Sequence, residues 1–240
     1  MLKKIIKIIL ALITEVSFTL ALMVAGFIAY TFIWTDYKAD QETEKAVNMF
    51  QEENPIENTT IISEDSHDVV HFDNIPTYDK PAVGEVFAVL HIPKWDGMEV
   101  PIAEGTTNDV LNKGYAGHYP ATELIGEEGN FSVAAHRRTK GSSFREIDTL
   151  VNGDKVIIET SDAYLVYEMY DHKIVKPEDP DSLKAFNVIP WEDNSTPDGY
   201  YMTMTTCHPE YGNSERYIVN LKFVYWVSKE DGVPSILGGQ

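Results

Sequence analysis

The sequence is poor in cysteine. Its 240 residues contain one, Cys207, so no intramolecular disulfide can form. The thiol is therefore either a packed side chain or a reactive group. A lone cysteine commonly behaves as a small buried hydrophobic residue, so the surrounding pattern must decide between the two.

Basic residues are also scarce. The chain carries 19 Lys and Arg against 38 Asp and Glu, a formal net charge of −19 at pH 7. Such a surface repels phosphate backbones, and the sequence contains no basic stripe with interleaved aromatic residues. Nucleic acid is therefore excluded as a partner.

Charge is nearly absent from the first 34 residues, which carry only Lys3, Lys4, Lys7 and Glu15. The apolar run 8–34 is long enough, at ~1.5 Å per residue, to cross a hydrocarbon core of ~30 Å. It is too long for a cleaved signal peptide, whose apolar region spans ~7–15 residues. Lysines precede it and an acidic flank follows, so we expect a single-pass cell-membrane anchor with a cytoplasmic N-terminus and an extracellular domain. No second apolar span follows, so anchoring at one end only is expected.

Composition predicts four parts. Residues 37–83 are acidic and mixed in character, with a short surface helix predicted over 40–51. The alternative to a free stalk is that this segment packs on the domain through Ile61, Ile62, Val69, Val70 and Phe72. The predicted parts are a cytoplasmic tip and transmembrane anchor (1–36), an acidic extracellular stalk (37–83), a β-domain (84–228) and a polar C-terminal tail (229–240).

From Gly84 onward, short apolar runs alternate with polar residues and are bounded by Gly, Pro and Asp-Gly turns. This period of two predicts strands. Many short strands with few helices favour a closed β-barrel or a sandwich over alternating strands and helices. The predicted strands are 86–92, 99–103, 130–136, 155–160, 163–175, 199–206 and 217–228, and the predicted helical turns are 108–113 and 143–147.

Three residues at predicted strand ends could carry chemistry. His136 and Cys207 each close a strand, and Arg216 opens the strand after Cys207. A thiol with a pKa of about 8.5 is partly ionised near neutral pH and attacks acyl carbons. A histidine with a pKa of about 6.5 can protonate a leaving amine, and an arginine can hold an oxyanion. Together these residues indicate acyl transfer through a thioester.

The pattern resembles a known family. Thr-x-Thr-Thr-Cys at 203–207, an Arg nine residues later opening Arg-Tyr-Ile-Val, and an upstream strand ending in Ala-x-His are similar to sortases, over residues 84–227. The resemblance implies a closed eight-stranded β-barrel with His136, Cys207 and Arg216 as catalytic residues and no cofactor. It implies cleavage of a Leu-x-x-Thr-Gly sorting signal on secreted proteins, between Thr and Gly. Transfer to the amine of a cell-wall peptidoglycan precursor in Gram-positive bacteria would follow.

Within the family, three motifs are most similar to class E, which favours Leu-Ala-x-Thr-Gly, with class D next. The motifs are 117–122, 126–131 and Cys207-His208-Pro209. This resemblance implies that Tyr119 selects the alanine. Ala135 stands where the family usually has Gly, and Met204 where Leu is commoner, so the choice between classes E and D stays open.

Further residues are predicted to bind the sorting peptide. Thr205 and Thr206 precede the nucleophile, although threonine also simply favours strands. His118 either faces the site or caps a turn. His208 would point to the opposite face from Cys207 on a continuing strand, which favours a structural role. The pair Arg137-Arg138 would meet either substrate carboxylates or solvent.

No metal site is predicted. An acidic group offers the oxygen ligands that calcium prefers, but it lacks an EF-hand spacing and a solvated loop is favoured. One Cys and scattered His lack the paired spacing of a zinc site. The acidic group is Glu178, Asp179, Asp181, Glu192 and Asp193.

Three alternatives remain. A pilin-polymerising class C sortase would carry an Asp-Pro-aromatic lid and a second membrane span, and the segment 72–76 matches the lid poorly. A non-catalytic, membrane-tethered domain would bind a surface protein or wall glycan, with Cys207 merely packed. A plain cysteine endopeptidase would use water in place of the amine. A papain-like enzyme is disfavoured because its Cys precedes its His.

Overall fold

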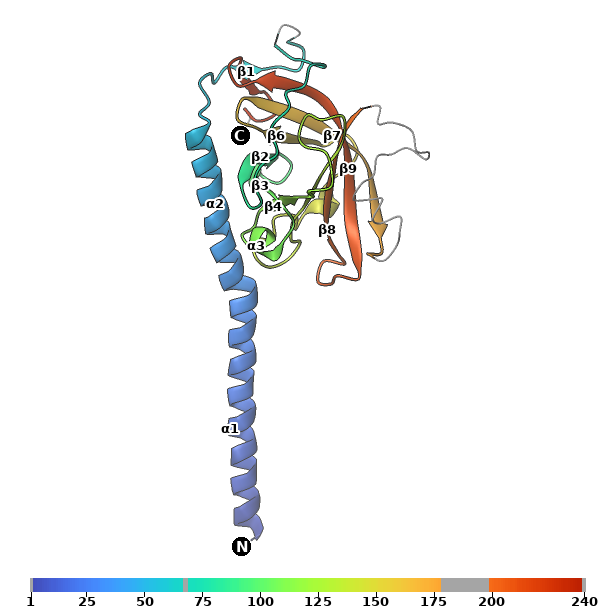
Figure 1. Cartoon of the computed structure of the whole chain (residues 1–240). Coiled ribbons are helices and arrows are strands. Elements are labelled where there is room, and N and C mark those ends of the chain that lie inside the picture. The colour runs from blue at the N-terminus through green and yellow to red at the C-terminus, as the bar shows by residue number, and fades with distance from the viewer. Residues whose placement is uncertain (1, 67–68, 178–198, 239–240) are drawn as a thin grey trace.

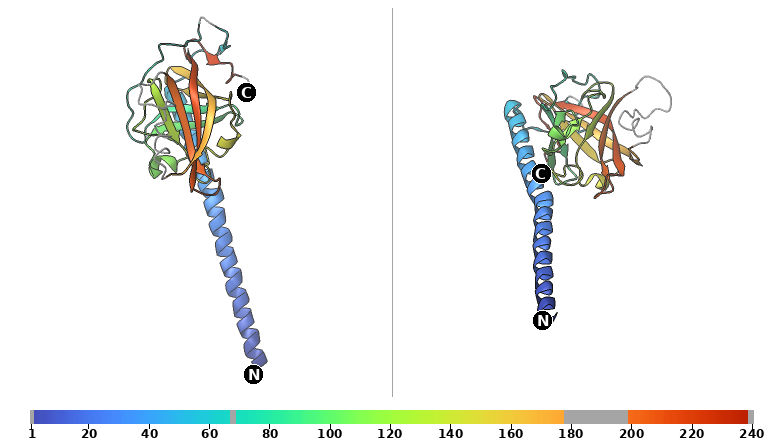
Figure 2. Two further views of the ribbon diagram at one scale, coloured as in Figure 1. Left: turned by 90° about the vertical axis from the view of Figure 1, so that its right-hand side faces the viewer. Right: turned by 60° about the horizontal axis from the view of Figure 1, so that its bottom comes forward.

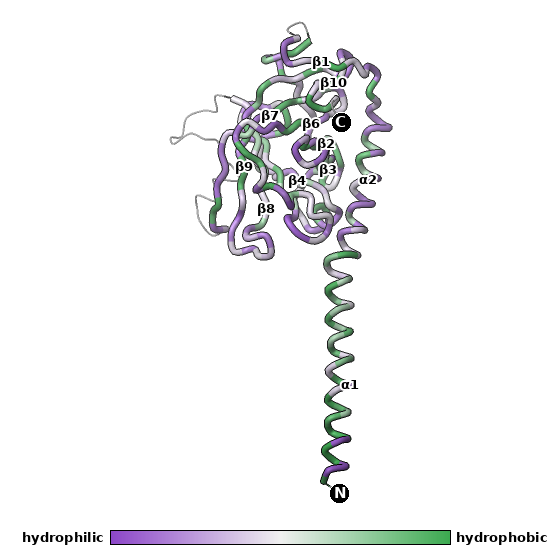
Figure 3. The backbone as a smooth tube through the Cα atoms, turned by 180° about the vertical axis from the view of Figure 1, so that it is seen from behind, coloured by the Kyte–Doolittle hydropathy of each residue, from purple (hydrophilic) through white to green (hydrophobic). Residues whose placement is uncertain are grey.

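The computed structural model describes residues 2–66, 69–177 and 199–238. A long helical rod leads to a β-barrel (Figure 1). The rod consists of α1 (Leu2–Ala29), a π-helical turn η1 (Tyr30–Trp34) and α2 (Thr35–Glu53). No residue of α1 is buried, and Figure 3 shows that its hydrophobic colour gives way to hydrophilic along α2. By length and composition, this helix can cross a membrane.

Helix α2 lies along one side of the barrel, next to β2 and β3 (Figure 1). Ala46, Val47 and Phe50 are buried and share one helix face. They pack on barrel residues including Val89 and Tyr115. Within residues 37–83, helix α2 therefore packs on the barrel rather than standing free of it. Of the residues named for the alternative, Ile62 and Val70 are buried against the domain, whereas Ile61 and Phe72 are exposed.

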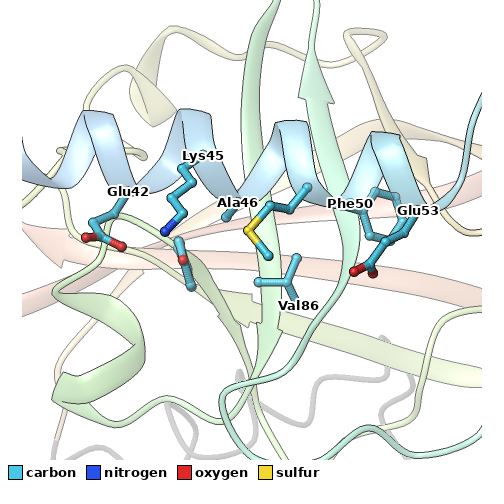
Figure 4. Close-up of a pocket in the computed structure, with 8 residues that line it drawn as sticks. Glu42, Lys45, Ala46, Phe50, Glu53 and Val86 are labelled. Atoms are coloured by element: carbon cyan, nitrogen blue, oxygen red, sulfur yellow. The ribbon is translucent and has the colours of Figure 1, made fainter.

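A groove of about 280 Å³ follows this contact. Figure 4 shows the side chains of α2 reaching toward Val86 across it. Its walls are Glu42, Lys45, Ala46, Met49, Phe50, Glu53, Val86 and Tyr115.

The barrel is closed in the order β2-β3-β4-β5-β8-β9-β7-β6, and Figure 2 shows it from two further sides. The predicted eight-stranded barrel is confirmed. Its strands are β2 (Val86–Ile92), β3 (Met98–Glu104), β4 (Ala116–His118), β5 (Gly129–Ala134), β6 (Lys155–Glu159), β7 (Ala163–Val175), β8 (Tyr200–His208) and β9 (Glu215–Ser228).

The structure moves several predicted boundaries. Strand β5 ends at Ala134, so His136 lies two residues beyond it, and Cys207 lies inside β8 rather than after it. Strand β4 was not predicted, because three residues that include a glycine give no alternation. The predicted turn 108–113 contains helix α3 (Asn108–Leu111). The predicted turn 143–147 is a hydrogen-bonded turn that leads into the 3₁₀ helix η2 (Ile147–Thr149).

Alternate residues of the strands point into the barrel core, although both faces of β5 and of the middle of β8 are buried. Phe131, Met202, Met204 and Val219 lie in the main hydrophobic core. Because side chains alternate along a strand, Thr203, Thr205 and Cys207 point to the other face of the sheet. That outer face carries the site described below.

The C-terminal segment packs against the domain rather than forming a polar tail. Strand β10 (Val233–Pro234) pairs in parallel with β1 (Ile61–Ile62). The buried Lys229 Nζ lies 2.7 Å from Glu159 Oε1 and donates to Asn54 O at 3.0 Å. Glu159 Oε2 in turn lies 2.8 Å from His91 Nε2. This buried ionic cluster joins the end of α2, the barrel and the C-terminal segment.

Candidate active site

Cys207 and Arg216 lie directly opposite each other. They are partners in the antiparallel register of β8 and β9. Directly opposed residues share a face, with Cβ atoms about 4.5–5.5 Å apart. The guanidinium is held by its own loop, since Nη1 donates to Asn213 O at 2.9 Å and Glu215 O at 2.8 Å. A fixed cation therefore stands beside the half-buried thiol.

His136 reaches the same place from β5. Ala134 pairs with Thr205 in the parallel register of β5 and β8. The Thr206 hydroxyl donates to Ala135 O at 2.7 Å, which fixes the backbone just before the histidine. His136 and Cys207 line one pocket of about 440 Å³. The other lining residues are Phe32, Arg137, Arg138, Thr139, Glu210, Tyr211, Gly212 and Asn213.

Asn112 orients the imidazole. His136 Nε2 donates to Asn112 Oδ1 at 3.0 Å, which leaves Nδ1 free to exchange a proton. A nucleophile, a base and a group that orients the base form the usual logic of covalent catalysis. Sequence reasoning missed Asn112, because it follows the short helix α3 and belongs to no motif around Cys207 or His136.

Burial has the largest effect on the pKa of His136. It lowers the pKa of the imidazole, and the nearby Lys140 ammonium lowers it further, while the Asp36 carboxylate opposes both. The neutral imidazole is therefore favoured at rest.

A second contact joins the segment after β5, which contains His136, to the end of β8, which contains Cys207. Buried Arg137 donates from Nη1 to His208 Nδ1 at 2.9 Å. Its Nη2 lies 2.6 Å from Asp148 Oδ2. The residue after the histidine thus holds the residue after the cysteine. Arg137 is buried but still lines the pocket of His136 and Cys207. The contact that His208 makes with Arg137 accords with the structural role that its strand face favours.

Arg138 contacts two other residues that line the pocket. Arg138 forms an ion pair with Glu210, and its guanidinium carbon lies 4.9 Å from the centre of the Tyr211 ring.

Tyr119 lies close enough to Cys207 on β8 and Arg216 on β9 for both residues to affect its pKa. Burial raises the pKa of its hydroxyl, the Arg216 guanidinium opposes this rise, and the Cys207 thiol adds to it. Thr205 lies two residues before Cys207, on the same face. Its hydroxyl is buried and has no hydrogen-bond partner among the described residues. A buried polar atom of this kind is costly unless something else satisfies it.

His118 lies elsewhere. It is fully buried, with Nδ1 2.5 Å from Glu104 Oε2 and its ring stacked on Phe131. Its Nε2 lies 3.1 Å from both Thr122 Oγ1 and Glu123 O. Both nitrogens are used inside the barrel, so the geometry favours a packing role over the predicted contact with substrate.

The acidic group considered for calcium, within residues 178–193, lies outside the described residues. Over 2–66, 69–177 and 199–238, no three His, Cys, Asp or Glu side chains gather in a way that could hold a metal ion.

Comparisons with known proteins agree with this geometry. A family model described as the sortase domain matches residues 90–224, more than half of the chain. The chain belongs to the sortase family. The members of this family are cysteine transpeptidases, and the sortase barrel is the fold observed here.

Individual sortases support the assignment. Sortase SrtE1 of Streptomyces coelicolor is 32% identical over 93% of this chain, which spans 59% of that relative's length. Sortase D of Bacillus subtilis is 29% identical over 82% of this chain and 90% of its own. The solved SrtA sortase from Actinomyces oris is 38% identical with a TM-score of 0.66, covering 71% of this chain and 97% of its own. The predicted likeness to class E, with class D next, is confirmed.

In this sortase, loosening the contact between Arg137 and His208 is expected to slow catalysis. A displacement of about 1 Å at a reacting group can cost about 100-fold in rate, so we expect Arg137→Gln to lower kcat/KM for a sorting peptide about tenfold. The measurement is steady-state cleavage by the full chain in detergent micelles.

The control for this effect is Lys222→Gln on the exposed face of β9, which should leave kcat/KM unchanged. His208→Gln should reproduce the loss, and the double variant should be little worse than either single one because the two side chains share one interaction. Additive losses would contradict the coupling.

Proposed function

We propose that this chain is a membrane-anchored transpeptidase. It cleaves a Leu-x-x-Thr-Gly type signal on secreted proteins between Thr and Gly, and transfers the acyl group to a cell-wall precursor amine. The carrying observation is that Cys207 and Arg216 face each other in register while His136 lines the same pocket as the thiol.

The first step is acylation. The Cys207 thiol first passes its proton to the neutral His136 imidazole. The resulting thiolate attacks the carbonyl carbon of the substrate threonine, and a carbon–sulfur bond forms. The electron pair of the C=O bond moves to oxygen, where the Arg216 guanidinium stabilises the negative charge. When the intermediate collapses, the C–N bond to glycine breaks and the His136 imidazolium protonates the departing amine. A thioester and a neutral imidazole remain.

The second step reverses the roles. The acceptor amine attacks the thioester carbon, and the oxyanion again lies beside Arg216. Neutral His136 takes the proton that the amine loses, while the C–S bond breaks and the thiolate leaves. The new amide joins the threonine to the acceptor. Because one pocket holds both proton donor and nucleophile, the same three residues serve both steps.

Peptide recognition is assigned to the outer face of β8. The unpartnered Thr205 hydroxyl would hydrogen-bond the backbone of the sorting peptide, which would supply the partner that this buried group lacks. Tyr119 would stand over the second position of the motif and favour alanine there, giving Leu-Ala-x-Thr-Gly. Thr206, whose hydroxyl already donates to Ala135 O, would act through the backbone just before His136.

The anchor would place this chemistry outside the cell. Lys3, Lys4 and Lys7 precede α1, and positive charge is retained on the cytoplasmic side. Helix α1 is long and apolar enough to span the bilayer. The barrel would then meet secreted proteins and wall precursors on the outer surface.

The test uses the full chain in detergent micelles with two peptides that differ at one position, Leu-Ala-x-Thr-Gly and Leu-Pro-x-Thr-Gly, and an amine acceptor. We expect mass spectrometry to find the Thr–acceptor product, and hydroxylamine to trap the thioester as a hydroxamate. The alanine peptide should react faster. Equal rates would contradict the assigned selectivity.

The alternatives give different results. If water replaces the amine even with excess acceptor, the product is a peptide that ends in a threonine carboxylate, and the protein is an endopeptidase. The absence of any product would favour a non-catalytic binding domain. A class C lid receives no support: Asp73 O accepts a hydrogen bond from Trp226 Nε1 at 2.9 Å. Trp226 lies ten residues along β9 from Arg216, about 30 Å away at the rise of a strand.

A further inference from the structure

The first turn of α2 is bound to the loop that follows His136. Asp36 Oδ1 accepts a hydrogen bond from Gly141 N–H at 3.1 Å, and Oδ2 accepts one from the Ser142 hydroxyl at 3.1 Å. Arg145 Nη2 lies 3.5 Å from the same Oδ2. Asp36 lies two residues after the apolar run 8–34, so the end of that run holds the histidine loop (residues 137–145).

One turn later, α2 packs closely on two glycines. A Cβ at Gly141 would lie 3.1 Å from Ala39 Cβ and 2.9 Å from Gly114 Cα. A Cβ at Gly114 would lie 2.6 Å from Thr43 Oγ1. Gly141 has φ +95°, a conformation that favours glycine. The helix therefore touches the histidine loop and the segment 112–114 at once.

Both contacted segments bind His136 itself. Asn112 Oδ1 accepts from the imidazole at 3.0 Å, and the Thr43 hydroxyl donates to the next residue, Lys113 O, at 3.3 Å. The Phe144 N–H donates to His136 O at 3.0 Å. The Ser143 hydroxyl joins the two segments by donating to Gly114 O at 2.6 Å.

The histidine loop needs external support. Thr139, Lys140 and Ser142 have φ values of 65°, 55° and 48°, which side chains other than glycine rarely adopt. Such conformations persist only where the surroundings enforce them. The hydrogen bonds that Gly141 and Ser142 donate to Asp36 supply that support at the end of the strained run. Phe32, from η1 of the same rod, also lines the pocket of Cys207 and His136.

We propose that the juxtamembrane helix is part of the active site, with Asp36 as a positioning residue that holds the loop of His136 in its reactive arrangement. This inference rests on the proposed function and names a regulation of that same site. Catalysis then depends on how the anchor is seated against the barrel. A change in the tilt of the rod is transmitted to the imidazole through Asp36, Ala39 and Thr43.

Asp36 also affects the charge of the imidazole. Burial and the Lys140 ammonium lower the pKa of His136, whereas the Asp36 carboxylate raises it. Removal of the Asp36 charge therefore lowers the pKa of His136 further. The other charged or titratable groups that line the pocket are Arg137, Arg138, Cys207 and Glu210.

The test compares Asp36→Asn with Glu44→Gln in the full chain in micelles. Glu44 lies on the exposed side of the same helix, so its substitution removes the same charge without touching the loop. We expect Asp36→Asn to lower kcat/KM for the sorting peptide about tenfold, chiefly in kcat, since small displacements of reacting groups are costly. The histidine-dependent limb of the pH profile should move to lower pH. Glu44→Gln should match the wild type in both.

Two further measurements separate positioning from folding. Ser142→Ala removes one partner of Asp36 and should give a smaller loss, about fivefold, that does not add to that of Asp36→Asn. Thermal unfolding should show that each variant is folded at the assay temperature. If Asp36→Asn and Glu44→Gln give equal rates and equal pH profiles, the inference is wrong.

NMR titration of ¹⁵N-labelled histidine, with His136 assigned by His136→Gln, reads the site without turnover. The pKa of His136 should fall in Asp36→Asn and stay constant in Glu44→Gln. If the wild type gives no product while the pKa of His136 is lower in Asp36→Asn than in the wild type, the proposed function is contradicted and the inference is retained. If the wild type is active, an equal pKa together with equal kcat/KM in the three proteins overturns the inference. If the wild type is inactive, an equal pKa alone does so.

Discussion

Replacing Cys207 by alanine is expected to abolish both the hydroxamate and the transpeptidation product, leaving rates at background. The thiol supplies the bond through which the acyl group is held, and no other side chain lining the pocket is a comparable nucleophile. Removing the nucleophile of a covalent catalyst costs about 10⁶-fold in kcat in a serine protease. The measurement is product formation by mass spectrometry over hours at high protein concentration.

A matched control for this result is Ser214→Ala, in the exposed turn between β8 and β9. This substitution removes a hydroxyl group seven residues after Cys207, and the variant should keep the wild-type rate. Peptide binding to Cys207→Ala should persist, because Thr205 and Tyr119 are unchanged. Product formation by Cys207→Ala at the wild-type rate would remove the catalytic assignment.

The second large effect is expected on stability. Lys229→Met removes the cation that faces buried Glu159 at 2.7 Å, and methionine fills similar volume without a charge. Breaking a buried ion pair from one side costs about 3–5 kcal/mol, because a charge is left without its partner. Denaturant unfolding of the full chain at pH 7 should show this drop in the free energy of unfolding.

The pH dependence of the loss identifies its cause. Burial alone would raise the pKa of Glu159, but hydrogen bonds and charges from His91 and Lys229 lower it below the ordinary value of 4.5. A carboxyl with a lowered folded-state pKa stabilises the protein above its unfolded pKa, and this stability is lost as pH falls through the folded pKa. The difference between wild type and Lys229→Met should therefore be large at pH 7 and shrink below pH 4.5.

The control for stability is Lys222→Met on β9, whose side chain is 52% exposed and lies 3.8 Å from Glu168 Oε1. Exposed pairs contribute about 0–1 kcal/mol, so this variant should unfold close to the wild type. Equal losses in the two variants would show that burial of the Lys229 cluster carries no special energy.

The sequence predicts the barrel well because strand alternation is a local signal. Strands β2 and β7 have the predicted bounds, since each is a run of alternating or continuous apolar residues between turns. Strand β4 escapes, because its three residues gain their strand conformation only from β3 and β5 on either side. The packing of α2 is not predicted, since its charges hide Ala46, Val47 and Phe50 and the expectation for residues 40–51 is a surface helix.

The candidate site is predicted only in part. The three proposed catalytic residues can be picked out because their types match one chemistry and their spacing resembles the sortase pattern, and their roles stay predictions. The residues that hold them cannot be picked out. Asn112 lies 24 residues before His136, and Asp36 lies 105 residues before Gly141. No local pattern encodes contacts at that separation, so only the folded chain reveals them.

The pairing of β1 with β10 fixes an order of events in biogenesis. Asn58 donates to Glu230 O, 172 residues away, and the parallel ladder beside it needs residues that emerge from the ribosome late. Contacts of such separation form slowly, because the loop between them must close first. Lys229, the partner of both Asn54 and Glu159 in the buried cluster, is synthesised after the whole barrel. The barrel strands can therefore pair before Glu159 gains the cation that neutralises it.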